Sequence, residues 1–266
     1  MNYVQHLIQF VLISSLLFIA HWMLSLFTQT FFHHRYSAHR MFTMTQGWEK
    51  FWFLMSWLFQ GASYLSPWAY GILHRRHHAY ADQENDPHSP RYDKNIWAMM
   101  RRTAKEYHAI FTGKNRKDIE EFDKNLPQWY SFDQLGHMWP TRVLWIVAYV
   151  IVYTTLVEKF EVGMLGYLIS IPLIIGHSIM GPMHGVVINW FAHGRGYKNY
   201  SLDNDSTNLW PRDLLMIGEG LHNNHHMRPS SPNFAHYANE FDPTYWVIKL
   251  FDKLDIIQLR VPTKGD

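Results

Sequence analysis

The sequence predicts an all-α integral membrane protein with about three transmembrane helices, one re-entrant or interfacial helix and a cytoplasmic helical cap. Three observations lead to this fold class. No residue before Arg35 is formally charged, and two further apolar runs flank the short charged segment EKFE. Histidines are concentrated in HRYSAH, HRRHH and HNNHH, each near a predicted membrane boundary. Because no internal repeat or low-complexity segment divides the 266 residues, we interpret 1–266 as a single domain.

The first crossing is predicted at about residues 4 to 32. Its apolar run, LIQFVLISSLLFIAHWMLSLFTQTFF, is longer than the roughly 20 residues needed to cross a hydrocarbon core. A cleaved signal peptide is not expected, since the run has neither a basic segment before it nor a small-residue cleavage site. The second and third crossings are predicted at 142 to 160 and 162 to 186, joined by a tight turn at EKFE.

Residues 51 to 73 form a further uncharged run, but Gln60, Gly61, Ser63 and Pro67 interrupt it. If all histidine segments serve one site, the chain between His39 and His74 crosses the membrane twice or not at all. Two crossings need about 40 apolar residues, and only 34 residues are available. This run is therefore predicted to be re-entrant or interfacial, as a broken helix shielded by protein. The polar segments 74–140 and 195–266 are predicted to form most of the cap.

The distribution of charge predicts an orientation. Of the 24 Lys and Arg residues, 23 fall on the side of the histidine segments, and only Lys159 lies in the opposite turn. This asymmetry is typical of a cytoplasmic face, so we expect the histidine segments and the C-terminus inside and the N-terminus outside. A formal charge of +2 without a basic stripe argues against nucleic-acid binding. The absence of cysteine restricts any metal to nitrogen and oxygen ligands.

The spacing of the histidines indicates metal ligation. His74, His77 and His78 stand at i, i+3 and i+4, so a helix presents them on one face, and HNNHH repeats this spacing. His34 and His39 are five residues apart and need a bulge or a helix end to reach one ion. We expect a two-metal, all-imidazole site. Its predicted ligands are His34, His39, His74, His77, His78, His193, His222, His225 and His226.

The remaining isolated histidines are interpreted as ordinary core or surface residues. Glu219-x-x-His222 matches half of the motif of soluble di-iron bundles, which need two such motifs and two further glutamates. Only one occurs here.

Together, HRYSAH, HRRHHAYADQENDPH, NWFAH and GEGLHNNHH resemble the membrane fatty acid desaturase family of the acyl-CoA desaturase type, from about Thr30 to Pro232. The resemblance implies two iron ions held by the nine histidines, Asn189 reaching one metal through water, and dioxygen as co-substrate. It also implies an external electron donor, either a b-type cytochrome or a ferredoxin with its reductase. The chain departs from the family in having room for one crossing before HRYSAH, where two are common, and in lacking a His-Pro-Gly-Gly haem motif.

The expected function is therefore insertion of a cis double bond into a long-chain acyl substrate, with acyl-CoA as the expected carrier. Arg75, Arg76, Arg101 and Arg102 are candidates for binding an anionic headgroup, or they reflect the positive-inside bias alone. A hydroxylase or acyl-lipid oxygenase on the same scaffold is the first alternative. A histidine-rich metal transporter or haem carrier is the remote one, because the clustered histidines lie at span ends and not at mid-bilayer depth.

Overall fold

The structure is a computed structural model, and residues 2 to 260 are described. Helix α1 (Tyr3–Thr28) continues without a break into the π-helix η1 (Gln29–Ala38), giving an apolar rod of 36 residues. Its start is fixed by Asn2, whose side chain accepts the Gln5 N–H while the Gln5 side chain accepts the Asn2 N–H. The first predicted crossing is thus present as one continuous helix, and it carries the HRYSAH segment at its end.

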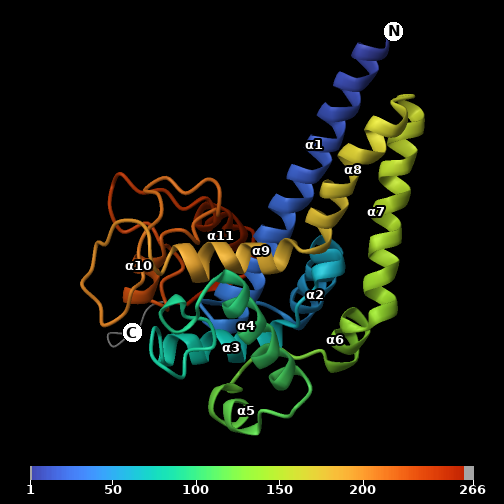
Figure 1. The fold of residues 1–266 in the computed structure, drawn as a ribbon. Helices are drawn as coiled ribbons and strands as arrows, with labels where there is room; N and C mark the ends of the chain where they lie inside the picture. Colours follow the sequence, from blue (N-terminus) through green and yellow to red (C-terminus); the bar gives the residue numbers. More distant parts are fainter. Residues whose placement is uncertain (1, 261–266) are drawn as a thin grey trace.

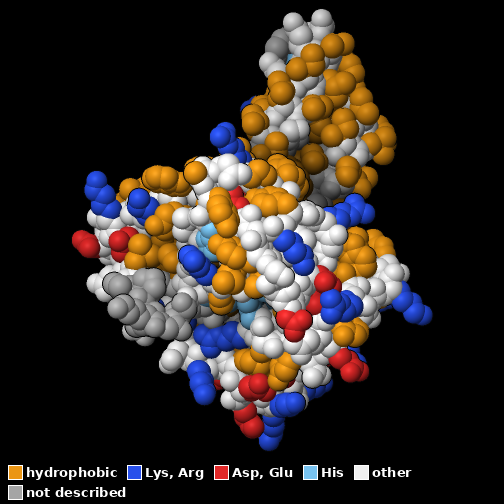
Figure 2. Space-filling view, turned by 90° about the vertical axis from the view of Figure 1, so that its left-hand side faces the viewer, with side chains coloured by type: hydrophobic (Ala, Val, Ile, Leu, Met, Phe, Trp, Pro, Cys, Tyr) orange, Lys and Arg blue, Asp and Glu red, His pale blue; other side chains and the backbone are white. Residues whose placement is uncertain are grey.

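Helices α7 (Trp139–Lys159) and α8 (Gly163–Ser178) stand beside α1 and project with it from the rest of the molecule (Figure 1). The tight turn between them uses positive φ at Glu161 and Gly163. In Figure 2 hydrophobic side chains dominate the projecting part, whereas charged side chains are scattered among hydrophobic and other groups over the remainder. Helices α1 and α7 are each long and apolar enough to cross a membrane, and a bent helix pair beginning with α8 gives a third candidate.

The predicted third crossing at 162 to 186 is wrong as a single continuous helix. Helix α8 ends at Ser178, and α9 (Met180–Val186), which continues into the π-helix η4 (Val187–Phe191), leaves at 71°. Pro182 gives the physical reason, because it has no N–H for the Ser178 carbonyl and its ring would clash with that carbonyl in a straight helix. In α9 the same proline lies in the first turn, where it is tolerated.

The run at 51 to 73 is broken, as the sequence predicts. Helix α2 (Gln46–Gln60) is followed by the short 3₁₀ turn η2 (Gly61–Ser63) and by α3 (Pro67–Ala79). Gly61 has φ +52°, and a Cβ there would lie 1.8 Å from the Tyr149 hydroxyl, so only glycine fits. With 15 residues, α2 is roughly 22 Å long, too short to cross a hydrocarbon core alone.

The polar body of the molecule comprises the described residues outside α1, α7 and α8. Its further helices and strands are α4 (Ile96–Phe111), α5 (Arg116–Phe122), α6 (Tyr130–His137), α10 (His222–Met227), α11 (Pro243–Lys253), η3 (Pro90–Tyr92), β1 (Phe42–Thr43) and β2 (Gln258–Leu259). The expectation of a helical cap fails for 195 to 221, where the described chain forms turns and isolated bridges. Buried amides replace a helix there: Asn208 accepts the N–H groups of Asn223 and Asn224.

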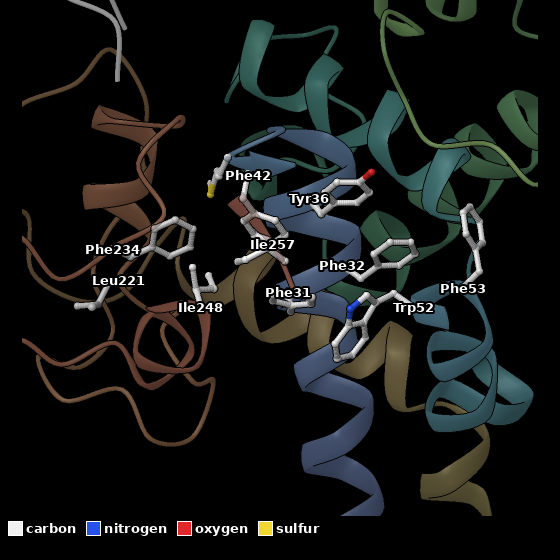
Figure 3. Packing of buried hydrophobic residues seen from close by; sticks show 11 residues of the cluster. Phe31, Phe32, Tyr36, Phe42, Trp52, Phe53, Leu221, Phe234, Ile248 and Ile257 are labelled. Carbon is white, nitrogen blue, oxygen red and sulfur yellow. The ribbon is translucent and has the colours of Figure 1, made fainter. Parts of the chain in front are cut away.

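An aromatic core joins η1 to the C-terminal part of the chain. Phe31 and Phe32 of η1 pack with Trp52 of α2, and Ile248 and Phe234 lie in the same cluster (Figure 3). Burying each of these side chains is worth roughly 1.5–3 kcal/mol. Strands β1 and β2 pair antiparallel beside the core, with Phe42 opposite Leu259. This packing fixes η1, and so the first histidine segment, against the elements that carry the last one.

Helix α6 is attached to the turn before α3 through a buried carboxyl group. Asp133 accepts hydrogen bonds from the Tyr64 hydroxyl at 2.6 Å and the Ser66 hydroxyl at 2.7 Å. Burial raises the pKa of Asp133 from 3.8 to about 6, and the two hydrogen bonds offset only part of this effect.

A measurable pH dependence follows from Asp133. Because its folded-state pKa is the higher one, its contribution to stability is full below about pH 4 and is lost as the pH rises to about 6. The two-unit shift corresponds to an upper bound of about 3 kcal/mol. In detergent, we expect Asp133→Asn to flatten the dependence of Tm on pH in this window. The exposed Asp255→Asn is the control, and an unchanged profile for Asp133→Asn would contradict the assignment.

Candidate metal centre

Nine histidines converge in two adjacent groups inside the polar body. The five-histidine group contains His34, His39, His74, His78 and His225. The four-histidine group contains His77, His193, His222 and His226. Within each group the candidate ligand nitrogens all lie within 4.8 Å of one another. The structure therefore brings together all nine residues that the sequence singles out.

The π-helix explains how His34 and His39 reach the same group. The His39 N–H donates to the His34 carbonyl at 3.1 Å, an i to i+5 bond that widens the helical turn. The wider turn places residues five apart on the same face, which an α-helix would not do. The spacing of His34 and His39 predicts a bulge or a helix end at this point, and the structure has both.

Each HxxHH segment divides between the two groups. On α3, the Nε2 atoms of His74 and His78 lie 3.0 Å apart in the five-histidine group, while His77 belongs to the four-histidine group. On α10, His225 joins the first group and His222 and His226 join the second. Both groups therefore draw on α3 and α10, while the first histidine segment completes the five-histidine group and His193 completes the four-histidine group.

The chemistry of the donor set fits metal ions. Nε2 atoms face one another at 2.9 Å in the pairs His34–His225 and His193–His222. A neutral imidazole has only one N–H, so five converging nitrogens cannot satisfy one another, and their lone pairs require a cation. Burial lowers the pKa of most of these rings and keeps them in the neutral, ligating form. The rings with lowered pKa are His39, His74, His78, His193, His222, His225 and His226.

Three buried carboxylates orient three of the rings, and the sequence analysis did not identify them. The Nδ1 atoms of His34, His77 and His193 lie 2.5–3.0 Å from carboxylate oxygens of Glu219, Asp86 and Asp82, respectively. A carboxylate at Nδ1 holds the proton there and leaves Nε2 free to bind metal. The signals were present, since Asp82 and Asp86 follow the second histidine segment and Glu219 precedes His222 by three residues.

The carboxylates of Asp82 and Asp86 are held in the ionised form by the histidines that they contact. Burial alone would raise the pKa of Asp86, but the charge and hydrogen bond of His77, together with the charge and backbone N–H of His88, hold it well below its usual range. His193 lowers the pKa of Asp82 to about 2 in the same way. His77 differs from the seven rings whose pKa is lowered. Burial acts to lower its pKa, but the charge and hydrogen bond of Asp86 act against burial, and the net direction is upward. Both aspartates are therefore ionised throughout the neutral range.

We expect Asp86→Asn to weaken metal binding by about 10- to 100-fold, as loss of an outer-shell partner does. The amide N–H would donate to His77 Nδ1 and move the ring proton to Nε2, where the metal lone pair is needed. Chelator competition on purified protein measures the change. Asp203→Asn removes an exposed carboxylate and should have no effect, and equal affinities for both variants would exclude the orienting role.

An apolar cavity of about 330 Å³ opens beside the histidine groups. His34, His74 and His222 reach it from the metal side, and Asn189 lines it as well. The position of Asn189 is compatible with the water-mediated role that the family resemblance implies. His88, which the sequence analysis did not single out, also lines the cavity; it is buried, and neither ring nitrogen has a hydrogen-bond partner in the described structure.

The arginines predicted to bind a headgroup have mostly internal partners. Arg75 donates to the carbonyls of Ala38, Phe122 and Lys124. Arg76 pairs with two carboxylates of the polar body, and Arg102 pairs with Asp93. Among the four, Arg101 alone makes no hydrogen bond or ion pair within residues 2 to 260 and is exposed. A headgroup role is therefore retained as a proposal for Arg101 only.

Fold and site together define a helical membrane protein with a buried polyhistidine centre next to an apolar cavity. The family described as fatty acid desaturase matches residues 8–238, and the chain belongs to this family. It is 25% identical over 245 residues to a Delta-9 desaturase-like 4 protein of Arabidopsis thaliana, covering 88% of this chain and 72% of the relative. This membership favours an enzyme over a transporter or haem carrier.

Two further relatives differ in the acyl carrier that their names state. An acyl-CoA C20 Delta5-desaturase of Anemone leveillei is 24% identical over 243 residues, covering 90% of this chain and 70% of the relative. A sn-2 palmitoyl-lipid 9-desaturase of Nostoc sp. (strain 36) is 34% identical over 80 residues, covering 29% of this chain and 28% of the relative. The relatives thus include both acyl-CoA and acyl-lipid desaturases.

Proposed function

We propose that this protein introduces a cis double bond into a long-chain fatty acyl group, using dioxygen and electrons from a separate donor. The observation that carries the proposal is the convergence of nine histidines in two groups that border an apolar cavity. Imidazole nitrogens suit iron, and two groups provide for two ions. An apolar cavity with few polar groups suits a methylene chain.

The chemistry requires an oxidant, because no side-chain acid or base removes hydrogen from an unactivated methylene. Two iron ions, when bound, would supply the redox chemistry of dioxygen reduction. In balance, two hydrogens from adjacent carbons, two protons and two donor electrons reduce one dioxygen to two waters. The residues of the chain hold the nine ring nitrogens in place, orient three of them through carboxylates, and keep the acyl chain in an apolar space that limits water.

Product analysis tests the proposal. An expressing host that is fed saturated fatty acids should accumulate cis-monounsaturated products, identified by mass spectrometry after derivatisation. Accumulation of hydroxylated acids instead would establish the alternative, in which oxygen is delivered to the first carbon before a second hydrogen is removed. No new product with any fatty acid, in protein that contains iron, would refute both.

The orientation is part of the same proposal. The charge asymmetry supports histidine groups and a C-terminus on the cytoplasmic face, where a b-type cytochrome or a ferredoxin with its reductase would deliver electrons. Reporter fusions at residues 2, 46, 160 and 266 should read outside, inside, outside and inside. An outside signal at 46, or an inside signal at 160, would overturn this topology.

A further inference from the structure

The cavity has a lateral opening between α4 and α9. Among its lining residues, Ala104 and His108 of α4 and Pro182 of α9 are exposed, and Gly185 is half-buried. Figure 1 shows α9 lying across the foot of α8, with α4 beside it. The opening is thus placed where the projecting apolar helices meet the polar body, which is the level of a membrane interface.

An exposed apolar ridge leads from the projecting helices to this opening. Ile171 and Ile175 lie four residues apart on α8, Ile179 lies at the junction between α8 and α9, and Met183 lies on α9. Their exposed fractions are 52%, 53%, 41% and 38%. Ile171 and Ile175 share one face of α8, and exposed apolar side chains resume past the 71° bend with Met183, next to Pro182 at the opening. Lipid acyl chains would cover such an apolar surface and shield it from water.

A cationic group stands on the other side of the opening. Arg101 and Lys105 are exposed on α4, on the same helical face as Ala104 and His108. Neither Arg101 nor Lys105 makes a hydrogen bond or ion pair with another described residue, whereas the adjacent Arg102 is paired with Asp93. Two unpaired cations beside an apolar opening match the chemistry of a phosphate ester attached to an acyl chain.

We propose that the acyl substrate is carried by a glycerophospholipid and enters the cavity sideways from the bilayer, between α4 and α9. Its phosphate lies against Arg101 and Lys105, and its acyl chain passes Ala104 and Gly185 towards the histidine groups. This inference rests on the proposed function and names its substrate class. A coenzyme A thioester is disfavoured because Arg75, Arg76 and Arg102, which would have formed a phosphate cradle, are used internally.

Photocrosslinking tests the route without requiring turnover. The full chain is placed in lipid nanodiscs containing phosphatidylcholine with a diazirine in one acyl chain, irradiated, digested and analysed by mass spectrometry. Adducts are expected on cavity residues such as Met100 and Ile188. Gly185→Leu should remove most of the adduct, because a Cβ at Gly185 would meet only Asn189 Nδ2, at 3.7 Å, and the longer side chain would enter the opening.

Matched variants make the result specific. Gly47→Leu, at a helical glycine outside the cavity lining whose Cβ would meet only Thr45 Oγ1, at 3.9 Å, should crosslink like the wild type. Ala104→Leu is a second blocking variant at an exposed position, in case Gly185→Leu does not fold. Arg101→Ala combined with Lys105→Ala should also lower the yield. Adducts that persist in the blocked variants, or that acyl-CoA displaces as fully as unlabelled phosphatidylcholine does, would overturn the proposal.

Desaturation assays on the same preparations distinguish failure of this inference from failure of the proposed function. If it desaturates acyl-CoA in detergent and the blocking variants do so equally well, the lateral route is wrong and the function stands. If no acyl donor is desaturated although the lipid adduct forms and is blocked as expected, the proposed function fails while the binding site remains.

Discussion

Replacing His77 or His225 with alanine should abolish turnover and lower the iron content of the purified protein. The two residues belong to different groups, so each variant is expected to disturb one group directly. Removing a ligand nitrogen should cost more than the roughly 10- to 100-fold that follows loss of an outer-shell partner. Iron quantitation by elemental analysis, together with product formation, measures the effect.

His6→Ala is the matched control for this experiment. Its ring nitrogen lies 2.9 Å from the Phe160 carbonyl, near the opposite end of α1 from the histidine groups. The substitution removes an imidazole that has no contact with the candidate centre, so iron content and turnover should equal those of the wild type. Full activity in both His77→Ala and His225→Ala would end the assignment of these groups as the metal site.

Arg35→Met should destabilise the folded protein by about 3–5 kcal/mol, the effect expected when one partner of a buried ion pair is removed. The guanidinium is completely buried and donates to Asp242 at 2.8 Å and to Glu219 at 3.2 Å. Methionine would leave two carboxylates without their cation in the interior. Thermal unfolding in detergent, followed by tryptophan fluorescence, should show a large fall in Tm.

Arg91→Met provides the comparison, because Arg91 pairs with Asp205 at the surface, where both side chains are more than 40% exposed. Solvent screens such a pair, and its loss should cost about 0–1 kcal/mol. Equal losses of stability in the two variants would contradict the view that Arg35 holds the first histidine segment to the C-terminal region.

The fold could be predicted in outline because hydrophobic length and charge act locally. The apolar runs of α1 and α7 exceed the thickness of a hydrocarbon core, and the interruption at Gly61 and Pro67 marks where the helix breaks. The bend between α8 and α9 was missed because the uncharged run continues on both sides of Ile179. A proline in such a run either kinks a span or begins a new helix, and packing decides which.

Residues 195 to 221 were predicted to be part of a helical cap but form turns, and here too tertiary contacts decide the conformation. The polar residues of this segment suit a helical surface as well as a buried network. Asn208 and Asp213 are completely buried, and each binds several backbone N–H groups contributed by other turns of the chain. The Asn208 bonds join residues 15 and 16 positions apart and the Asp213 bonds join residues 3, 5 and 7 apart, so neither set follows a helical period.

The sequence by itself singled out the nine histidines that converge in two groups. For the two HxxHH segments the reason is that a spacing of three or four residues on a helix is a local property. Only the tertiary structure decided how the nine divide, with His77 turning to one group while His74 and His78 turn to the other. It also decided that three carboxylates orient histidine rings, those of Asp82, Asp86 and Glu219. Likewise, the hydrogen bonds and ion pairs of Arg75, Arg76 and Arg102 go to groups within the protein. The physical reason is that a charged side chain forms hydrogen bonds with the groups that the fold brings within about 3 Å. Those groups come from distant parts of the chain, so the local sequence does not predict them.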